Sequence, residues 1–327
     1  MRIKRPPIFL FALAPLVTGC LCANDPGNLV PRTVAEDPSL PAIDLAGTRF
    51  HSEAFGDPAA PVILVLHGGP GSDYRCLLPL QALADDGYRV VFWDQRGSGL
   101  SARQDPGSID LDVYLEDLRQ IIEYYAPSQP VVFIGQSWGA MYATAFIDRY
   151  GDYGGKIRGA ILTDPGAFTE AQLEGFLKRY QGSLSPTSER FNDALWAEQF
   201  ISAADHERAD YLGMLFAMRG VPAEGDDPRN PIPQWRYGAY VNSRLLHIAK
   251  QGFDWTQHLS AFTHPVLFLR SELNTAATLE LQEDEAASYP NARIETIAGA
   301  GHHMIWQHSD EYLADARAYL REIGVAP

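Results

Sequence analysis

Short apolar runs recur along the chain, and each has the length and continuity of a strand buried on both faces. They occupy residues 61–67, 88–94, 131–134, 159–163, 265–269 and 292–297. Segments with helical spacing lie between them, most clearly 109–126, where Leu111 and Leu115 share one face. Helices are also expected near 77–86 and, as an amphipathic closing element, over 309–323. Strands that alternate with helices in this way predict an α/β fold with a mostly parallel, doubly wound sheet.

The alternation stops between about residues 167 and 262, where no buried-strand pattern is present. Helical spacing occurs there instead, near 169–181, 189–203, 206–219 and 234–251, with Gly- and Pro-rich turns between the stretches. We therefore predict a helical cap over 166–262, inserted into an α/β core that is formed by 41–165 and 263–327.

The N-terminus has the parts of a bacterial export signal. Basic residues in the first five positions precede an apolar stretch over 8–17, which is too short to span a bilayer stably. Val17–Cys20 resembles the lipobox of bacterial lipoproteins, which implies removal of residues 1–19 and lipidation of Cys20. A plain secretory signal cut near Cys22 is the alternative. We expect a flexible tether over 20–40 and a place in the bacterial cell envelope, with membrane contact only through the lipid anchor.

Composition narrows the class of protein further. Hydrophobic residues make up 46% and charged residues 20% of the 327 residues, so the chain is globular rather than disordered. A net charge of -15 argues against nucleic acid as a partner. Once Cys20 is lipidated, Cys22 and Cys76 remain in an oxidising compartment, where they either form a disulfide or both stay free.

The most informative motif is Gly135–Gly139, which reads Gly-Gln-Ser-Trp-Gly. It lies between a buried strand and a helical stretch, the setting in which Gly-x-Ser-x-Gly forms a nucleophile elbow. The two glycines permit a sharp turn, and the turn exposes the Ser137 hydroxyl at the positive end of a helix. Ser137 is therefore the predicted nucleophile, against the alternative of an ordinary Gly-rich turn.

A serine nucleophile needs a base and an oxyanion hole. His302 follows the last predicted strand and two loop-shaping glycines, so it is the predicted base, with His303 as its competitor. For the oxyanion hole, the glycines after the first buried strand leave N–H groups free to point into the site. Gly68 or Gly69 could donate there, and we predict Gly69 together with the Trp138 N–H, directly after the nucleophile.

Three motifs together resemble those of the proline iminopeptidase family of α/β-hydrolases: His67–Gly71, Asp94–Ser101 and Gly135–Gly139. They occur in the family's order, and the resemblance covers about residues 45–325. It implies an α/β-hydrolase fold with a helical cap and a serine hydrolase that removes N-terminal residues from small peptides. It also implies that neither a cofactor nor a metal is needed, and that Asp94–Ser101 is a loop that shapes the site.

The third member of a catalytic triad is less clear from the sequence. The family pattern places an aspartate after the strand 265–270, where this chain has Asn274. In a serine protease, the matching change from Asp to Asn lowers the rate about 10⁴-fold. Asp164, directly after the strand 159–163, is the preferred replacement, and Glu272 is the alternative. Asn274 itself, or no third residue, also stays open.

Two enzymatic functions and one binding function follow from these residues. The first is an aminopeptidase of the proline iminopeptidase type, acting on small peptides or amides. It would need cap carboxylates for the substrate's amino group, and Glu198, Glu207 and Asp210 are candidates. The second is a carboxylesterase for small esters. The third, suggested by Asn274, is a lipoprotein that binds a ligand with little turnover. The oligomeric state is not predicted.

Overall fold

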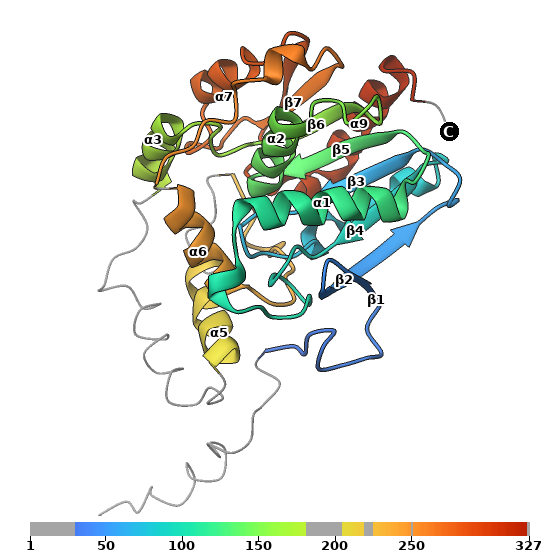
Figure 1. The fold of residues 1–327 in the computed structure, drawn as a ribbon. Coiled ribbons are helices and arrows are strands. Elements are labelled where there is room, and N and C mark those ends of the chain that lie inside the picture. Colours follow the sequence, from blue (N-terminus) through green and yellow to red (C-terminus); the bar gives the residue numbers. More distant parts are fainter. Residues whose placement is uncertain (1–29, 181–204, 219–224, 250, 326–327) are drawn as a thin grey trace, which may run out of the picture.

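The computed structural model describes residues 30–180, 205–218, 225–249 and 251–325. Its centre is an eight-stranded sheet with the order β1-β2-β4-β3-β5-β6-β7-β8 (Figure 1). The strands are β1 (Ala42–Leu45), β2 (Thr48–Phe55), β3 (Val62–Leu66), β4 (Arg89–Trp93), β5 (Val131–Gln136), β6 (Ile157–Thr163), β7 (Val266–Ser271) and β8 (Ala292–Ile297). The pairings of β1 with β2 and of β2 with β4 are antiparallel, and all the others are parallel. The predicted mostly parallel sheet is confirmed.

Helices cover both faces of this sheet. Those outside the cap are η2 (Arg75–Ala84), η3 (Pro106–Ser108), α1 (Leu111–Tyr125), α2 (Trp138–Tyr150), α7 (Leu279–Ala286), α8 (Met304–Gln307) and α9 (Ser309–Glu322). The short η5 (Leu259–Ala261) lies at the end of the segment predicted as the cap. The side chains of β3 alternate between two cores. Leu64 and Leu66 pack with α1 and α2, whereas Ile63 and Val65 pack with η2 and α9. Burial on both faces explains why β3 is apolar throughout.

The described part of the cap consists of helices and an irregular segment over residues 225–238. It contains α3 (Glu170–Tyr180), α5 (Asp205–Met218) and α6 (Ala239–Ala249), all between β6 and β7. Figure 1 shows these helices on the side of the sheet toward which β5 points, and therefore near the end of the strand that leads to Ser137. The helical stretch predicted near 189–203 lies outside the described residues.

Part of the predicted tether packs against the domain. Thr33 and Val34 are buried, and the Val34 N–H donates to the Leu100 carbonyl at 2.8 Å. The expectation of a flexible segment over 20–40 therefore does not describe residues 33 and 34, because they have buried apolar and backbone partners. Cys20 and Cys22 lie outside the described residues. None of the helices in the described ranges has the length and apolar character needed to cross a membrane.

A buried carboxyl group on α7 makes the stability of the fold depend on pH. Glu285 is fully buried, and neither of its carboxyl oxygens has a hydrogen-bond partner among the described residues. Burial, reinforced by the negative charges of Asp284 and Asp164, raises its pKa well above the usual value. The folded protein therefore keeps a proton that the unfolded chain loses near about pH 4.3.

The sign of this effect can be tested by substitution. The stabilising contribution is full below about pH 4 and falls by about 1.4 kcal/mol per pH unit as the pH rises toward the folded-state pKa. We expect Glu285→Gln to remove this decline in the free energy of unfolding, measured with urea between pH 5 and 8. Glu283→Gln, on the exposed side of the same helix, is the matched control. An equal decline in Glu285→Gln and in the wild type would contradict the assignment.

Candidate active site

Ser137 lies at a sharp turn between β5 and α2. Its backbone has φ 56° and ψ -119°, a combination that residues other than glycine rarely adopt. Its N–H donates to the Thr163 carbonyl at 2.8 Å. The flanking glycines make the turn possible. A Cβ on Gly135 would lie 2.5 Å from the Gly139 carbonyl oxygen, and a Cβ on Gly139 would overlap the Leu66 carbonyl oxygen. The backbone thus has the geometry of the predicted nucleophile elbow.

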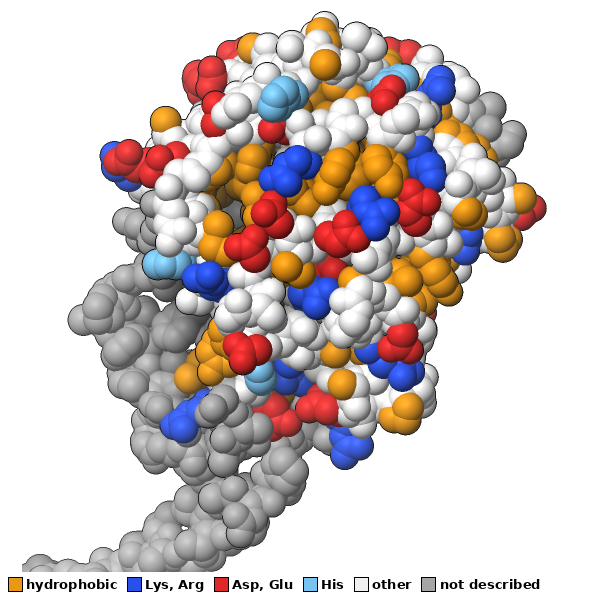
Figure 2. Space-filling model, in the orientation of Figure 1, with side chains coloured by type: hydrophobic (Ala, Val, Ile, Leu, Met, Phe, Trp, Pro, Cys, Tyr) orange, Lys and Arg blue, Asp and Glu red, His pale blue; other side chains and the backbone are white. Residues whose placement is uncertain are grey.

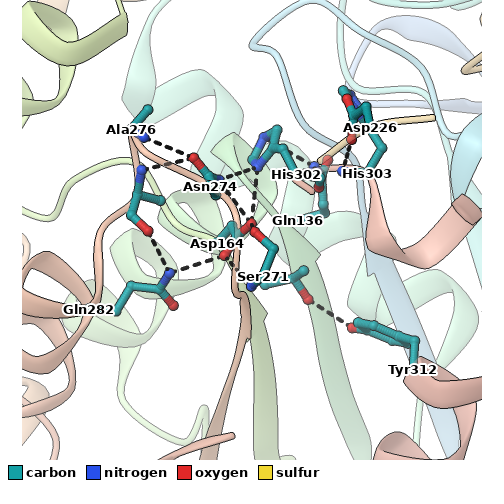
Figure 3. A network of polar contacts seen from close by, with 12 residues as sticks. Gln136, Asp164, Asp226, Ser271, Asn274, Ala276, Gln282, His302, His303 and Tyr312 are labelled. Atoms are coloured by element: carbon teal, nitrogen blue, oxygen red, sulfur yellow. Dashed lines mark hydrogen bonds and ion pairs between the residues drawn. The ribbon is translucent and has the colours of Figure 1, made fainter. Parts of the chain in front are cut away.

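His302 lies in the loop between β8 and α8, and its ring has partners on both nitrogens (Figure 3). Its Nδ1 lies 3.3 Å from Asp164 Oδ2 and 3.1 Å from Asn274 Nδ2. Its Nε2 lies 3.2 Å from the amide nitrogen of Gln136. The structure therefore brings the predicted base, the preferred acid and the asparagine of the family position into one cluster.

Asp164 directly follows β6 and is fully buried. Its Oδ1 accepts hydrogen bonds from the Ser271 N–H and from Gln282 Nε2, both at 3.0 Å. Its Oδ2 accepts from Ser271 Oγ and, at 3.0 Å, from Asn274 Nδ2. These donors compensate for the burial of a charged group and fix the direction of the carboxylate toward His302.

Asn274 and Glu272 have different positions relative to the histidine. The Oδ1 of Asn274 accepts from the N–H groups of Ala276 and Ala277, at 3.0 and 3.1 Å, so its Nδ2 must face Asp164 and His302. Glu272 is exposed, and its Oε2 accepts from the Gly299 N–H at 2.7 Å. Within the described structure Glu272 makes no hydrogen bond to His302. An asparagine donates through Nδ2 and cannot accept a proton there, so Asp164 is the carboxylate that can accept the His302 Nδ1 proton.

His303, the competing base, points toward the cap instead. Its Nδ1 lies 2.7 Å from Oδ2 of Asp226, a cap residue (Figure 3). Burial alone would raise the pKa of Asp226, but hydrogen bonds from His303 outweigh it and keep this pKa below its usual value. The pair attaches the segment after α5 to the loop that carries His302.

The predicted oxyanion donors lie on two adjacent turns. Gly69 is exposed, with φ 118°, and Trp138 is the first residue of α2. Among the described residues, neither N–H group donates to a backbone carbonyl. Gly68, the other candidate, is buried, and a Cβ on it would lie 3.2 Å from the Ser137 Cβ. Gly68 thus lies close to the nucleophile and Gly69 at the surface of the site, and the choice of Gly69 as the donor stays a prediction.

The cap holds the oxyanion loop in place. The Gly238 N–H donates to the Gly71 carbonyl at 2.6 Å, and Asn242 Nδ2 donates to the Pro70 carbonyl at 3.0 Å. Asp73 accepts from the N–H groups of Trp235 and Arg236, at 2.7 and 3.1 Å. Burial, together with the nearby negative charge of Asp94, raises the pKa of Asp73 to about 7.

The cap acids that the sequence suggested for an amino-group site have other roles or are not described. Asp210 on α5 is buried, and its Oδ2 lies 2.8 Å from both Arg103 Nε and Arg236 Nε. Asp210 therefore links the cap to the loop after β4. Its negative charge is neutralised by these two arginines, so it is not available to bind a cationic ligand. Glu207 is partly exposed, and Glu198 lies outside the described residues. In the described ranges, no three His, Cys, Asp or Glu side chains are grouped so that they could hold a metal ion.

Three polar residues around the histidine were not predicted from the sequence: Gln136, Ser271 and Gln282. Gln136 stands inside the Gly-x-Ser-x-Gly motif, at a position that the motif leaves open, so its place next to the nucleophile was readable. Ser271 and Gln282 carry no motif signal. They reach Asp164 only because β7 and α7 pack beside the end of β6.

The mostly parallel sheet and the nucleophile-elbow geometry at Ser137 are those of an α/β-hydrolase. Comparison with known proteins gives the family. The model of the "Alpha/beta hydrolase family" matches residues 63–316. The chain belongs to this family.

Curated relatives include proline iminopeptidases. The one from Clostridium botulinum is 35% identical over 274 residues, which cover 80% of this chain and 89% of the relative. The one from Heyndrickxia coagulans is 26% identical over 302 residues, covering 86% and 98%.

Solved structures show the same fold at lower identity. A thermophilic esterase from Thermogutta terrifontis superposes with a TM-score of 0.62 at 22% identity, covering 87% of this chain and 97% of the esterase. A proline iminopeptidase-related protein from Thermus thermophilus gives 0.61 at 20% identity, covering 86% and 96%. The solved structures thus show that the chain shares its fold with a peptidase-related protein and with an esterase, and a hydrolase activity is consistent with the family and its curated relatives.

Proposed function

We propose that the protein is a serine hydrolase with Ser137 as nucleophile, His302 as base and Asp164 as the acid of the triad. The observation that carries this proposal is the cluster of His302 Nδ1 and Asp164 Oδ2, at 3.3 Å, next to a strained serine at the start of α2. A carboxylate on Nδ1 holds the proton there and leaves Nε2 free to act as a base.

The reaction then proceeds in two halves. His302 Nε2 takes the Ser137 proton while the serine oxygen attacks the substrate carbonyl carbon. The N–H groups of Gly69 and Trp138 donate to the oxyanion of the tetrahedral intermediate. The imidazolium gives its proton to the leaving group, and an acyl-enzyme remains. Water, deprotonated by His302, releases the acid product and restores Ser137.

For the substrate class, we propose an aminopeptidase of the proline iminopeptidase type, acting on small peptides or amides. The support is the three sequence motifs together with the curated relatives named proline iminopeptidases.

A carboxylesterase is the second candidate, and a specific observation favours it. Binding of a cationic amino group needs a carboxylate that is not already neutralised. In the described part of the cap, Asp210 is paired with two arginines and Asp226 with His303, so that of the described acids suggested for this role only the partly exposed Glu207 is not so paired. A neutral ester would need neither of them.

A substrate panel distinguishes the two candidates. Purified full-length protein is tested with proline-naphthylamide, alanine-naphthylamide and short-chain nitrophenyl esters, and kcat/KM is compared. We expect the proline amide to be cleaved, together with some of the esters. Hydrolysis of esters alone would contradict the peptidase proposal and support the esterase.

We also propose that Cys20 carries a lipid and anchors the protein in the bacterial cell envelope. The lipobox-like Val17–Cys20 supports this location. Metabolic labelling with an alkyne fatty acid should mark the wild type and Cys22→Ala but not Cys20→Ala. Equal labelling of all three would contradict it.

A further inference from the structure

Gln136 occupies a place next to the reacting atoms that the proposed mechanism does not use. It is the last residue of β5, directly before Ser137, and is 5% exposed. Its Nε2 lies 3.2 Å from His302 Nε2 and 3.3 Å from the His302 carbonyl oxygen (Figure 3). Among the described residues, Ser137 Oγ makes no hydrogen bond to His302. The nitrogen that should activate the serine is thus in contact with the glutamine amide.

The orientation of this amide follows from its partners. A carbonyl oxygen only accepts, so the atom of Gln136 that faces the His302 carbonyl must be the nitrogen. The Oε1 then faces the oxyanion loop, where a Cβ on Gly68 would lie 2.5 Å away. Gln136 therefore lies between the loop of the base and the loop of the oxyanion hole, directly beside the nucleophile.

The contacts of the two ring nitrogens bear on which of them carries the proton in neutral His302. Both ring nitrogens face amide donors, because Asn274 Nδ2 lies 3.1 Å from Nδ1 and Gln136 Nε2 lies 3.2 Å from Nε2. Asn274 Nδ2 has its acceptor in Asp164 Oδ2 at 3.0 Å, so Nδ1 can donate its own proton to Asp164, and Gln136 Nε2 then donates to an unprotonated Nε2. The proton of the neutral ring then lies on Nδ1, which faces Asp164 Oδ2. In this tautomer the unprotonated Nε2 can accept the proton of the Ser137 hydroxyl.

We propose that Gln136 is a positioning residue that holds neutral His302 in the Nδ1–H tautomer and competes with Ser137 for His302 Nε2. The proposal rests on the proposed serine hydrolase function. When Nε2 takes the Ser137 proton, both nitrogens become donors, and the Gln136 contact must break. The amide thus stabilises the neutral ring but not the imidazolium. The charged or titratable groups near the ring are Asp164, His303 and Asp226.

The effect is measurable in the pH profile of kcat/KM. Gln136→Met keeps the size of the side chain but removes the donor, so the imidazolium becomes relatively more stable. Because one hydrogen bond to the neutral form is lost, we expect the acid limb to move up by about half to one pH unit, a three- to tenfold change in proton affinity. Gln136→Glu should move it further, since a carboxylate favours the imidazolium. Gln120→Met, at a partly exposed glutamine on α1, is the control.

A merely structural role would give a different result. It would lower kcat in Gln136→Met and leave the acid limb at the wild-type pH, and this result would overturn the proposal. A second measurement needs no variant of Gln136. The ¹⁵N shifts of histidine-labelled wild-type protein above the His302 titration should show Nδ1–H, and a dominant Nε2–H tautomer would also overturn it. Failure of a fluorophosphonate to label wild-type Ser137 would instead contradict the serine hydrolase itself, so the two failures are distinguishable.

Discussion

Ser137→Ala is expected to lower kcat by about 10⁶-fold, because the variant has no oxygen nucleophile for the first step. The fold should be retained, since alanine and serine both carry a Cβ and therefore face the same cost at the positive φ of residue 137. Some rate above that in water should remain, because the oxyanion donors and the substrate pocket are intact. The measurement is kcat on the best substrate of the panel, with thermal unfolding as the check on the fold.

Labelling by a fluorophosphonate probe gives an independent readout of the same prediction. The wild type and Ser108→Ala, an exposed serine far along the chain from the motif, should be labelled, and Ser137→Ala should not. Unchanged labelling of Ser137→Ala would place the nucleophile elsewhere. Strong binding of small molecules by an unlabelled wild type would instead favour the ligand-binding lipoprotein.

Asp164→Asn has the second largest expected effect, a decrease in kcat of about 10⁴-fold. An asparagine at this position can donate to His302 Nδ1, which stabilises the unproductive tautomer, and it supplies no charge for the imidazolium. KM should change little, because Asp164 is buried and lies behind the histidine. The measurement is kcat and KM at the pH optimum, with circular dichroism to confirm that the fold is intact.

Two companion variants separate the candidate acids. Glu272→Gln should keep nearly the wild-type rate, because Glu272 is exposed and contacts the Gly299 N–H. Asn274→Asp would place a second carboxylate beside Asp164, where the present contact is 3.0 Å, and the two acids would then share a proton. A large loss in Glu272→Gln combined with a small loss in Asp164→Asn would show that the acid is misassigned.

The position of Asp164 explains why the sequence alone did not identify the third member of the triad. Asp164 follows β6 and Asn274 lies shortly after β7, and these strands are parallel neighbours. Their carboxyl ends meet at one edge of the sheet, so side chains after either strand can reach the same histidine. The family motif specifies an aspartate after β7, so it does not detect a carboxylate that follows the neighbouring strand β6.

The distribution of charge on the surface also cannot be derived from the composition of the chain. On the face in Figure 2, acidic and basic side chains are interspersed rather than gathered by sign. The net charge of -15 therefore describes the whole chain and does not by itself locate an anionic site. The fates of Asp210 and Asp226 make the same point, because whether a cap carboxylate can bind an amine depends on the cations packed against it.

What the sequence determined by itself was local. Apolar runs alternating with helical spacing predicted the parallel sheet, and two glycines around Ser137 predicted the turn, because each of these patterns is contained within a short stretch of the chain. The tertiary structure decided everything that depends on distant segments meeting. It placed Asp164 and Asn274 on one nitrogen of His302 and Gln136 on the other, and it turned His303 toward the cap. Those contacts join residues far apart in the chain, and only the packing of the strands and loops brings them within hydrogen-bond range.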